Sequence, residues 1–553
     1  MKILERNWLA VSAIILFGLL LFLPFLGSVH LFDWDEINFA ESAREMIVTG
    51  DYLNVRINYQ PFWEKPPLFI WMQVLSMKVF GVNEFAARFP NALCGILTLL
   101  ALYAIGKKIY TPRFGMIWVL SYAAAILPFF YFKSGIIDPW FNLLIFSGVT
   151  FFVFYLEGEK GSRRILHLTG SAFFLGLAVL TKGPVAFLVF LISFIVFLVF
   201  RKFRIRTSLT DVLLFTLVLT LTGGSWFILQ LATGHQDVVL DFIRYQIRLL
   251  TTSDSGHAGF FMYHFVIVLL GVFPASILFL TSFTRKAESN ETQKSFKRWM
   301  YIMFWVVLLL FSVVKTKIIH YSLLTYFPMT FLAAWVWDKW IDRKIELRNW
   351  QIGIIFFIAL IYATLTIAGP LLVRNPDWVI SHYGKYLNLF RQQALLADVK
   401  WTGYEILPGI FLLLGTIVSL LLVIRRDVRG MVLLHVVSLV FVFSTISLIA
   451  PRVEQYGQGA VIEFYKELKG QDVYVNTLGF KSYAQLFYFE KQPVRPEADD
   501  LEWLMSQERD KEAFFVIKAH LKDEYLQKYP LLTVLYEKNG FVFTRLDKEG
   551  END

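Results

Sequence analysis

The stretch Leu31–Pro90 reads LFDWDEINFAESAREMIVTGDYLNVRINYQPFWEKPPLFIWMQVLSMKVFGVNEFAARFP and separates the first two apolar segments of the chain. It contains two charged motifs, Asp33-Trp34-Asp35-Glu36 and Glu64-Lys65-Pro66-Pro67. Charged side chains beside a membrane cost free energy unless they are paired or bind a ligand. This stretch is therefore the first candidate for a functional site.

Between the two motifs, residues 37–48 carry apolar side chains at helical spacing. Ile37, Ala40, Ala43 and Ile47 recur every three or four residues, so they share one face of a helix. An amphipathic helix in a loop between apolar segments is typical of a helix that lies in the membrane interface. We predict such an interfacial helix here.

The composition places this stretch in a membrane protein. Of the 553 residues, 56% are hydrophobic and 17% aromatic, and only 18% are charged, against about 25% charged in soluble domains. Uncharged runs of about 17–24 residues recur, which is the length that crosses a bilayer. We predict a polytopic α-helical membrane protein with about 13 transmembrane helices. The predicted spans are 8–26, 91–106, 114–132, 140–156, 165–180, 184–200, 212–232, 260–283, 299–314, 321–337, 350–373, 406–424 and 431–450.

Basic residues indicate how these helices are oriented. The net charge is +9, but the lysines and arginines form short clusters beside the apolar runs, so nucleic acid is not expected as a partner. Counted alternately from a cytoplasmic N-terminus, every cluster falls on one side, as the positive-inside rule requires. The clusters lie at 107–113, 160–164, 201–206, 285–298, 339–348 and 425–429. The first outer loop, 28–90, and the segment after Pro451 then lie on the outer side.

The N-terminal apolar run is expected to be a retained helix. Lys2 and Arg6 precede a run from Trp8 to Leu26 that is too long for a signal peptide and lacks a clear small-x-small cleavage site. Cys94 is the only cysteine, which excludes an intrachain disulfide and a cysteine-rich metal site. The expected protein is held in the membrane by many spans, with membrane lipids around it.

The last part of the chain has a different composition. Four runs read as strands and two segments between them read as helices, which predicts a small α/β domain at 451–553 beside a transmembrane domain at 1–450. The expected strands are 472–476, 514–518, 532–536 and 541–545, and the expected helices lie near 481–489 and 522–528. This segment has no glycine loop of the kind that cradles phosphates, and no chemistry is assigned to it.

Charged and polar side chains recur in the loops on the predicted outer side. They are Asp35, Glu36, Glu64, Lys65, Asp138, Lys182, Arg248, His257, Lys315, Lys317, His320 and Tyr321. Single members have structural explanations, since Asp138 before Pro139 can begin a helix and Lys182 can extend its ammonium to the membrane surface. Acids and cations from several loops on one membrane face nevertheless favour a ligand site.

The spacing of motifs in the first loop and beyond forms a series. It comprises Asp35-Glu36, Glu41-x-x-Arg44-Glu45-Met46, Gly50-Asp51, Phe62-x-Glu64-Lys65-Pro66-Pro67-Leu68-x-x-Trp71 and Phe80-Gly81-Val82-x-Glu84-x-x-Ala87-Arg88, followed by Asp138-Pro139, Thr181-Lys182-Gly183, Arg248 before Gly256-His257, and Lys317-x-x-His320-Tyr321. This series resembles the bacterial 4-amino-4-deoxy-arabinose lipid A transferases over roughly residues 8–340. It is similar, more loosely, to the protein O-mannosyltransferases, which share the C-type glycosyltransferase fold.

The resemblance implies a glycosyltransferase of the bacterial inner membrane. It would move a sugar from a polyprenyl phosphate to an acceptor, lipid A or another envelope glycan, on the outer face. The implied residues are Asp35, Glu36 and Asp138 for catalysis, Lys65 and Arg248 for the donor phosphate, and Glu64, His257, Lys317 and Tyr321 for the cavity wall. Lysine and arginine suit a departing phosphate because negative charge develops on it.

The resemblance leaves several points open. Some family members place a histidine four or five residues before the phosphate-binding arginine, where this chain has Arg244 or Ile243, so the sequence does not support a metal site that uses this histidine. No cofactor is assigned, and a divalent metal, the sugar and the acceptor stay open. The competing functions are an outer-face protein O-glycosyltransferase, a non-catalytic scaffold, and a lipid or sugar transporter. A transporter would be expected to show paired halves with broken helices near the midplane.

Overall fold

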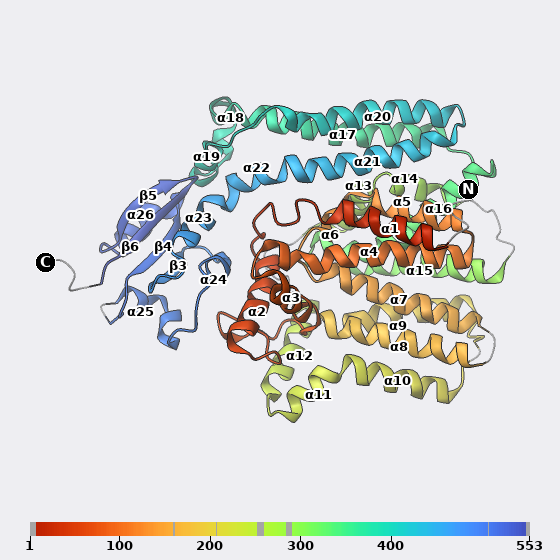
Figure 1. Cartoon of the computed structure of the whole chain (residues 1–553), viewed down its shortest axis with the longest axis horizontal. Helices are drawn as coiled ribbons and strands as arrows, with labels where there is room; N and C mark the ends of the chain where they lie inside the picture. Colours follow the sequence, from red (N-terminus) through yellow and green to blue (C-terminus); the bar gives the residue numbers. More distant parts are fainter. Residues whose placement is uncertain are drawn as a thin grey trace.

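The computed structural model describes residues 7–158, 161–205, 207–251, 259–283, 290–506 and 508–548. Most of the described chain forms long helices that lie side by side, and a small β-sheet lies at one end of them (Figure 1). This architecture agrees with the predicted polytopic helical membrane protein.

The helical bundle is built from apolar helices that coincide with the predicted spans. They are α1 (Asn7–Phe22), α4 (Glu84–Ile109), α5 (Pro112–Ala123) with α6 (Ile126–Phe132), α7 (Asp138–Glu157), α8 (Ser162–Lys182), α9 (Val185–Phe200), α10 (Leu209–Gly223) with α11 (Ser225–Ala232), α13 (Tyr263–Gly271) with α14 (Ala275–Thr281), α15 (Glu291–Val313), α16 (Tyr326–Ile341), α17 (Asn349–Val373), α20 (Leu407–Ile424) and α21 (Val428–Leu448). Within the described ranges, seven helices are long and apolar enough to cross a membrane, or up to ten if each bent pair is one span. The exact number of spans stays a prediction.

Three of the predicted spans are bent helix pairs. α5 and α6 meet at 77°, α10 and α11 at 60°, and α13 and α14 at 108°. The second break falls at Gly223-Gly224 and the third just before Pro274. Glycine and proline are the usual causes of sharp kinks. Glycine stabilises a helix poorly, and proline has no backbone N–H to donate to the helix hydrogen bonds.

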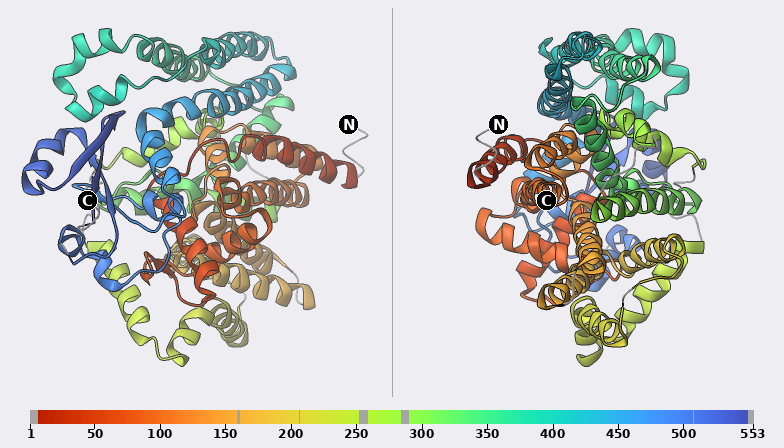
Figure 2. Two further views of the ribbon diagram at one scale, coloured as in Figure 1. Left: turned by 60° about the vertical axis from the view of Figure 1, so that its left-hand side comes forward. Right: turned by 90° about the vertical axis from the view of Figure 1, so that its right-hand side faces the viewer.

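The interior of the bundle is aromatic and its outside is apolar. Trp118 is fully buried and packs edge-on against Phe331 (5.0 Å between ring centroids) and Phe146 (5.9 Å). On the outer faces large apolar side chains are exposed, including Leu365 of α17 and Leu414 of α20. So much exposed apolar surface would be unfavourable in water, so these faces are suited to lipid. The views in Figure 2 place α17 and α20 at the edge of the bundle opposite α10 and α11.

The first outer loop folds into two helices and a short hairpin. These are α2 (Asp35–Thr49), β1 (Arg56–Ile57), β2 (Gln60–Pro61) and α3 (Leu68–Phe80). The predicted helix is present, but its surroundings differ from the prediction of an interfacial helix. Besides its apolar face, Glu41, Arg44 and Glu45 are buried, because α3 packs on one side of α2 and α24 (Ala484–Tyr488) on another.

The C-terminal segment forms a four-stranded sheet. Its strands β3 (Tyr474–Leu478), β4 (Ala513–Lys518), β5 (Thr533–Lys538) and β6 (Phe541–Leu546) lie within two residues of the expected strands and are arranged in the order β3-β4-β6-β5. β3 and β4 are parallel, and the other pairs are antiparallel. The shorter helices here are α24, α25 (Leu501–Met505) and α26 (Lys522–Lys528).

No sharp boundary separates this segment from the bundle. α21 leads through α22 (Ala450–Glu454), the π-helical turn Gln455–Gly459 and α23 (Ala460–Glu467) in one helical stretch. The division at residue 451 therefore lies inside this helical stretch, and it stays a prediction. Two further helices, α18 (Pro376–Tyr383) and α19 (Leu389–Leu395), lie in the segment that connects α17 to α20.

The two ends of the bundle differ in charge. Lys107 and Lys108 end α4, Arg201 follows α9, and Arg425 and Arg426 follow α20, all at the end away from the sheet. The first outer loop, α12 (Gln236–Thr251) and the sheet lie at the opposite end (Figure 1). The predicted basic end and the predicted site end are thus the two ends of the same bundle.

Candidate active site

Asp35 stands at the start of α2, directly after a strained turn. Its side chain is 52% exposed. The preceding Trp34 has φ of 73° and ψ of −106°, which is unusual for a bulky residue. The Tyr483 ring, 5.6 Å away, and the ammonium of Lys481, 5.5 Å from the Trp34 ring, pack against it. The C-terminal segment therefore supports the turn that places Asp35.

Asp138 and Lys182 meet at the ends of two adjacent helices. Lys182 Nζ, at the end of α8, donates a 2.6 Å hydrogen bond to Asp138 Oδ1, at the start of α7. His320 Nε2 lies 3.8 Å from Asp138 Oδ2 and 3.9 Å from Asp35 Oδ2. His320 belongs to the short helix η1 (Ile319–Thr325) and lies between the two carboxylates. Burial lowers the pKa of His320, and the negative charge of Asp138 opposes this shift.

Lys65 lies among the same charged groups. Its Nζ is 3.7 Å from Glu64 Oε2, and its side chain is 17% exposed. Burial is the main cause that lowers the pKa of Lys65, and the charge of Lys182 adds to it, while Glu64, Asp35 and Asp138 oppose it. An ammonium that has lost hydration in this way gains more than an exposed one from an anionic ligand.

Arg248 and Lys65 converge on one aromatic ring. Lys65 Nζ is 5.1 Å and Arg248 Cζ 5.2 Å from the centre of the Tyr245 ring. The Tyr245 hydroxyl donates a 2.9 Å hydrogen bond to Glu64 Oε2. α12 supplies both Tyr245 and Arg248, which are three residues apart and therefore share a helix face. The two residues assigned to the donor phosphate thus lie around the same tyrosine.

Glu36 has different surroundings from its neighbour Asp35. Its carboxylate is buried and accepts hydrogen bonds from Arg88 Nε (3.0 Å), Arg88 Nη2 (2.8 Å) and the backbone N–H of Phe32 (2.8 Å) and Gly135. Arg88 also donates to the carbonyl oxygens of Val29 and His30. A carboxylate with this many partners is suited to holding the loop on the bundle, so we now favour a structural role over the predicted catalytic one.

The other residues predicted to line the cavity, Lys317, Tyr321 and His257, differ in where the structure places them. Lys317 is buried, and its Nζ donates to the carbonyl oxygens of Phe311, Ser312 and Val314, so it caps the end of α15. This contact uses the ammonium that the sequence assigned to the cavity wall. Tyr321 is half-buried, and its ring lies 5.4 Å from Lys182 Nζ. His257 lies outside the described residues.

Sequence reasoning gave no role to three groups that the structure places at the site. From the sequence, His320 and Lys182 were included among the charged residues of the loops but were assigned no function. Their place in the motifs Thr181-Lys182-Gly183 and Lys317-x-x-His320-Tyr321 was the signal that could have identified them. Tyr245 had no signal beyond its spacing of three residues from Arg248. For a metal, the described ranges contain no group of three or more His, Cys, Asp or Glu side chains placed to hold an ion.

The arrangement can bind an anion next to an accessible carboxylate. Lys65, Lys182 and Arg248 supply positive charge from three separate segments, and Asp35 is the more exposed of the two acids beside His320. Lysine and arginine bind phosphate oxygens through charge-assisted hydrogen bonds. A carboxylate at such a site can accept a proton or orient a second reactant.

Comparison with known proteins places these residues in context. A family described as dolichyl-phosphate-mannose-protein mannosyltransferase matches residues 64–226. Undecaprenyl phosphate-alpha-4-amino-4-deoxy-L-arabinose arabinosyl transferase 2 of Proteus mirabilis (strain HI4320) is 27% identical over 383 residues, which is 67% of this chain and 67% of that protein. The corresponding transferase of Yersinia enterocolitica serotype O:8 / biotype 1B (strain NCTC 13174 / 8081) is 26% identical over 73% of this chain and 72% of its own length.

Solved structures agree in fold over nearly the whole chain. The crystal structure of ArnT from Cupriavidus metallidurans bound to undecaprenyl phosphate matches with a TM-score of 0.77, covers 98% of both chains and is 18% identical. The apo form of the same protein matches with a TM-score of 0.75. This chain therefore has the fold of ArnT from Cupriavidus metallidurans, and in sequence it resembles the undecaprenyl phosphate-alpha-4-amino-4-deoxy-L-arabinose arabinosyl transferases.

Proposed function

We propose that this chain is a membrane glycosyltransferase that moves a sugar from a polyprenyl phosphate to a lipid or glycan acceptor, with lipid A as the first candidate. The observation that carries this proposal is the convergence of Lys65 and Arg248 on Tyr245 beside the half-exposed Asp35. The similar transferases are named for an undecaprenyl phosphate-linked sugar, which supports this class of donor.

The cations fit the departing phosphate. When the bond between the anomeric carbon and the phosphate oxygen breaks, negative charge develops on the phosphate. Lys65 and Arg248, which both lie near the Tyr245 ring, would hold the phosphate, and fixed cations in a poorly hydrated site stabilise such charge strongly. Because burial lowers the pKa of Lys65, phosphate binding should also favour its protonated form.

Asp35 fits the acceptor side of the reaction. Asp138 is engaged by Lys182, so Asp35 is the carboxylate with the more open access. If the acceptor is a hydroxyl group, Asp35 would take its proton as a general base. If the acceptor is a phosphate, which is already ionised, Asp35 would orient it or stabilise positive charge on the sugar ring. We favour the general-base role.

The location of the site suits a lipid-linked donor. Asp138 and Lys182 stand at helix ends, and the loops around them lie at the end of the bundle away from the basic clusters. A polyprenyl chain could remain in the bilayer while its phosphate reaches these residues. We place this end on the outer side of a bacterial inner membrane, with the N-terminus in the cytoplasm.

A protein O-glycosyltransferase is the second candidate, because the family that matches residues 64–226 is described as a protein mannosyltransferase. A transporter is disfavoured, because the charged side chains gather at helix ends and not at the three bent pairs.

The direct test is reconstitution of the purified protein in nanodiscs with an undecaprenyl-phosphate sugar and lipid A. Mass spectrometry should detect glycosylated lipid A together with released undecaprenyl phosphate. Asp35→Asn should abolish most of the product, whereas Asp377→Asn, an exposed aspartate in α18, serves as the matched control. Transfer to an added protein in place of lipid A would favour the second candidate. No transfer to any acceptor, with intact donor binding, would contradict the proposal.

A further inference from the structure

His320 lies between two carboxylates of the candidate active site, and the proposed reaction does not use it. Its Nε2 is 3.9 Å from Asp35 Oδ2 and 3.8 Å from Asp138 Oδ2, and its side chain is 12% exposed. Both distances are longer than a hydrogen bond, so the ring nitrogen stands midway between the two acids. A shift of about 1 Å would bring it into hydrogen-bond contact with either of them.

The Asp138 side of this arrangement is fixed. Lys182 Nζ donates to Asp138 Oδ1 at 2.6 Å, and the other oxygen, Oδ2, faces His320. Asp138 is buried in the first turn of α7, and α7 packs against η1, the helix that carries His320. A buried carboxylate beside an imidazole holds the ring in one orientation and one tautomer. Asp138 therefore anchors His320.

The two carboxylates also decide which ring nitrogen of His320 carries the hydrogen. An ionised carboxylate only accepts hydrogen bonds, so a bare lone pair on Nε2 would face two acceptors. The hydrogen therefore belongs on Nε2. Burial lowers the pKa of His320, although the charge of Asp138 opposes this shift, so the ring is mainly neutral at pH 7. In this form Nε2–H is a neutral hydrogen-bond donor between the two acids.

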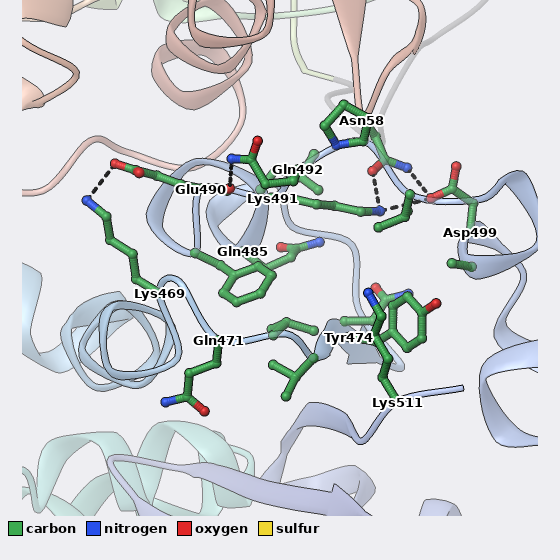
Figure 3. A pocket seen from close by; sticks show the side chains of 18 of the residues that line it. Asn58, Lys469, Gln471, Tyr474, Gln485, Glu490, Lys491, Gln492, Asp499 and Lys511 are labelled. Carbon is green, nitrogen blue, oxygen red and sulfur yellow. Dashed lines mark hydrogen bonds and ion pairs between the residues drawn. The ribbon is translucent and has the colours of Figure 1, made fainter. Parts of the chain in front are cut away.

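The backbone around Asp35 is held by the C-terminal segment, whereas its carboxylate is not. Arg44, farther along α2, donates to the carbonyl oxygen of Lys491 at 2.7 Å, and Lys491 Nζ donates to Asn58 of the adjoining hairpin at 2.6 Å (Figure 3). The Asp35 side chain is 52% exposed, and no group in the described ranges donates a hydrogen bond to it. Its orientation therefore depends on the donor that stands beside it, His320.

We propose that His320 is a positioning residue for Asp35, an inference that rests on the proposed function. Its Nε2–H would hold the Asp35 carboxylate in one orientation, while Lys182 and Asp138 hold the imidazole from behind. With a hydroxyl acceptor, the proton of that hydroxyl passes to Asp35, and the hydrogen of His320 stays on Nε2. Once Asp35 is protonated, the same N–H turns to Asp138, which is still ionised.

Side chains that reproduce a single ring nitrogen test this role. The amide nitrogen of glutamine reaches as far along the side chain as Nε2, whereas that of asparagine reaches only as far as Nδ1. His320→Gln should therefore keep most of the transfer rate. His320→Asn and His320→Leu should lower kcat by about ten- to a hundredfold, the scale of loss for a reacting group misplaced by about 1 Å. Their affinity for undecaprenyl phosphate should equal that of the wild type.

A double-mutant cycle separates positioning of Asp35 from a general structural role. Transfer is measured by mass spectrometry with the full-length protein in nanodiscs, an undecaprenyl-phosphate sugar and lipid A, over incubations long enough to quantify Asp35→Asn. If His320 acts through Asp35, adding His320→Asn to Asp35→Asn should cause little further loss, whereas independent effects multiply. His382→Leu, at an exposed histidine of α18, is the control and should transfer at the wild-type rate.

The outcomes that overturn this role are specific. They are the same loss from His320→Asn in both backgrounds, equal impairment of His320→Gln and His320→Asn, or full transfer by His320→Leu while Asp35→Asn is inactive. If thermal unfolding shows that His320→Leu is misfolded, the comparison of glutamine with asparagine decides. Absence of transfer by the wild type would overturn the proposed function and this inference together, which distinguishes it from the failure of His320 alone.

Discussion

The ammonium of Lys182 donates a 2.6 Å hydrogen bond to the carboxylate of Asp138, and this contact separates the roles of the two aspartates at the site. Asp138 is buried and engaged, whereas Asp35 is half-exposed and has only His320 within 4 Å as an ionic neighbour in the described ranges. The open carboxylate is therefore the one expected to meet an acceptor.

Asp35→Asn should lower the rate of sugar transfer by about a hundred- to ten-thousand-fold, the usual effect of removing a general base. With a hydroxyl acceptor the remaining rate should rise with pH, because more of the acceptor ionises without help. The measurement is a pH–rate profile of the reconstituted enzyme. A loss that does not depend on pH above neutrality would indicate the orienting role. Full transfer by both Asp35→Asn and Asp35→Ala would leave Asp35 as a residue that only begins α2.

Lys65→Ala and Arg248→Ala should each weaken binding of undecaprenyl phosphate by about 1.5–3 kcal/mol, or roughly ten- to 150-fold in Kd. Each variant removes one charge-assisted contact to the phosphate. Lys65→Arg need not restore binding, because the planar guanidinium has a different geometry from an ammonium. Calorimetry in nanodiscs measures the change.

Arg244→Ala is the matched control for Arg248→Ala. Arg244 lies on the same helix, is 76% exposed and pairs with Asp241 at the surface. Its removal should leave the affinity for undecaprenyl phosphate unchanged. Equal affinities in the wild type, Lys65→Ala and Arg248→Ala would contradict the assignment of the phosphate site.

Glu36→Gln should destabilise the protein by about 3–5 kcal/mol, because it leaves the buried Arg88 without its carboxylate partner. Glu346→Gln removes the partner of Arg426 at an exposed position and should cost at most about 1 kcal/mol. Thermal unfolding in detergent compares the two. The folded fraction of Glu36→Gln should keep more activity than Asp35→Asn. Normal stability combined with lost transfer would return Glu36 to the reacting groups.

Glu45 should make stability depend on pH. Burial and the charge of Glu41 raise the pKa of Glu45 above the ordinary value of 4.5, although its Oε2 accepts a 2.9 Å hydrogen bond from the N–H of Tyr59 and Arg44 lies nearby. The folded state therefore holds this proton more tightly than the unfolded state. As pH rises above the unfolded pKa, unfolding releases the proton, and the free energy of unfolding falls until the folded pKa is passed.

Glu45→Gln removes this titration. The unfolding temperature of the variant, relative to the wild type, should therefore be higher at pH 8 than at pH 5. A scan of thermal unfolding against pH measures the difference. If the difference in unfolding temperature between Glu45→Gln and the wild type is the same at pH 5 and pH 8, Glu45 is ionised in the folded state and the explanation fails.

The local sequence pattern was sufficient to predict where the helices and strands lie. Hydropathy marked the bundle helices, and the strand-like runs near the end of the chain located β3–β6 to within two residues. The burial of α2 could not be predicted in this way, because it depends on contacts such as that of Arg44 with the carbonyl oxygen of Lys491, which is 447 residues away. The end of the chain thus helps to bury Arg44, a charged residue of this helix.

At the candidate site, too, residue identities could be predicted from the sequence, whereas contacts between distant residues could not. The family resemblance implied roles for Asp35, Lys65 and Arg248, and the structure places these residues in one region. Partners could not be read from spacing, because Glu36 pairs with Arg88, 52 residues away, and Lys182 with Asp138, 44 residues away. Lys317 has the expected residue type, but the local turn after α15 brings its ammonium onto helix carbonyls.

The most direct test of the central claim is mass spectrometry of lipid A, surface polysaccharide and polyprenyl-phosphate sugars from a strain that lacks this protein. The account predicts that one polyprenyl-phosphate sugar accumulates and that the same sugar disappears from an envelope acceptor. Wild-type protein should reverse both changes, and Asp35→Asn, expressed at the same level, should reverse neither. Unchanged acceptors and unchanged polyprenyl-phosphate sugars in the deletion strain, or full restoration by Asp35→Asn, would contradict the claim.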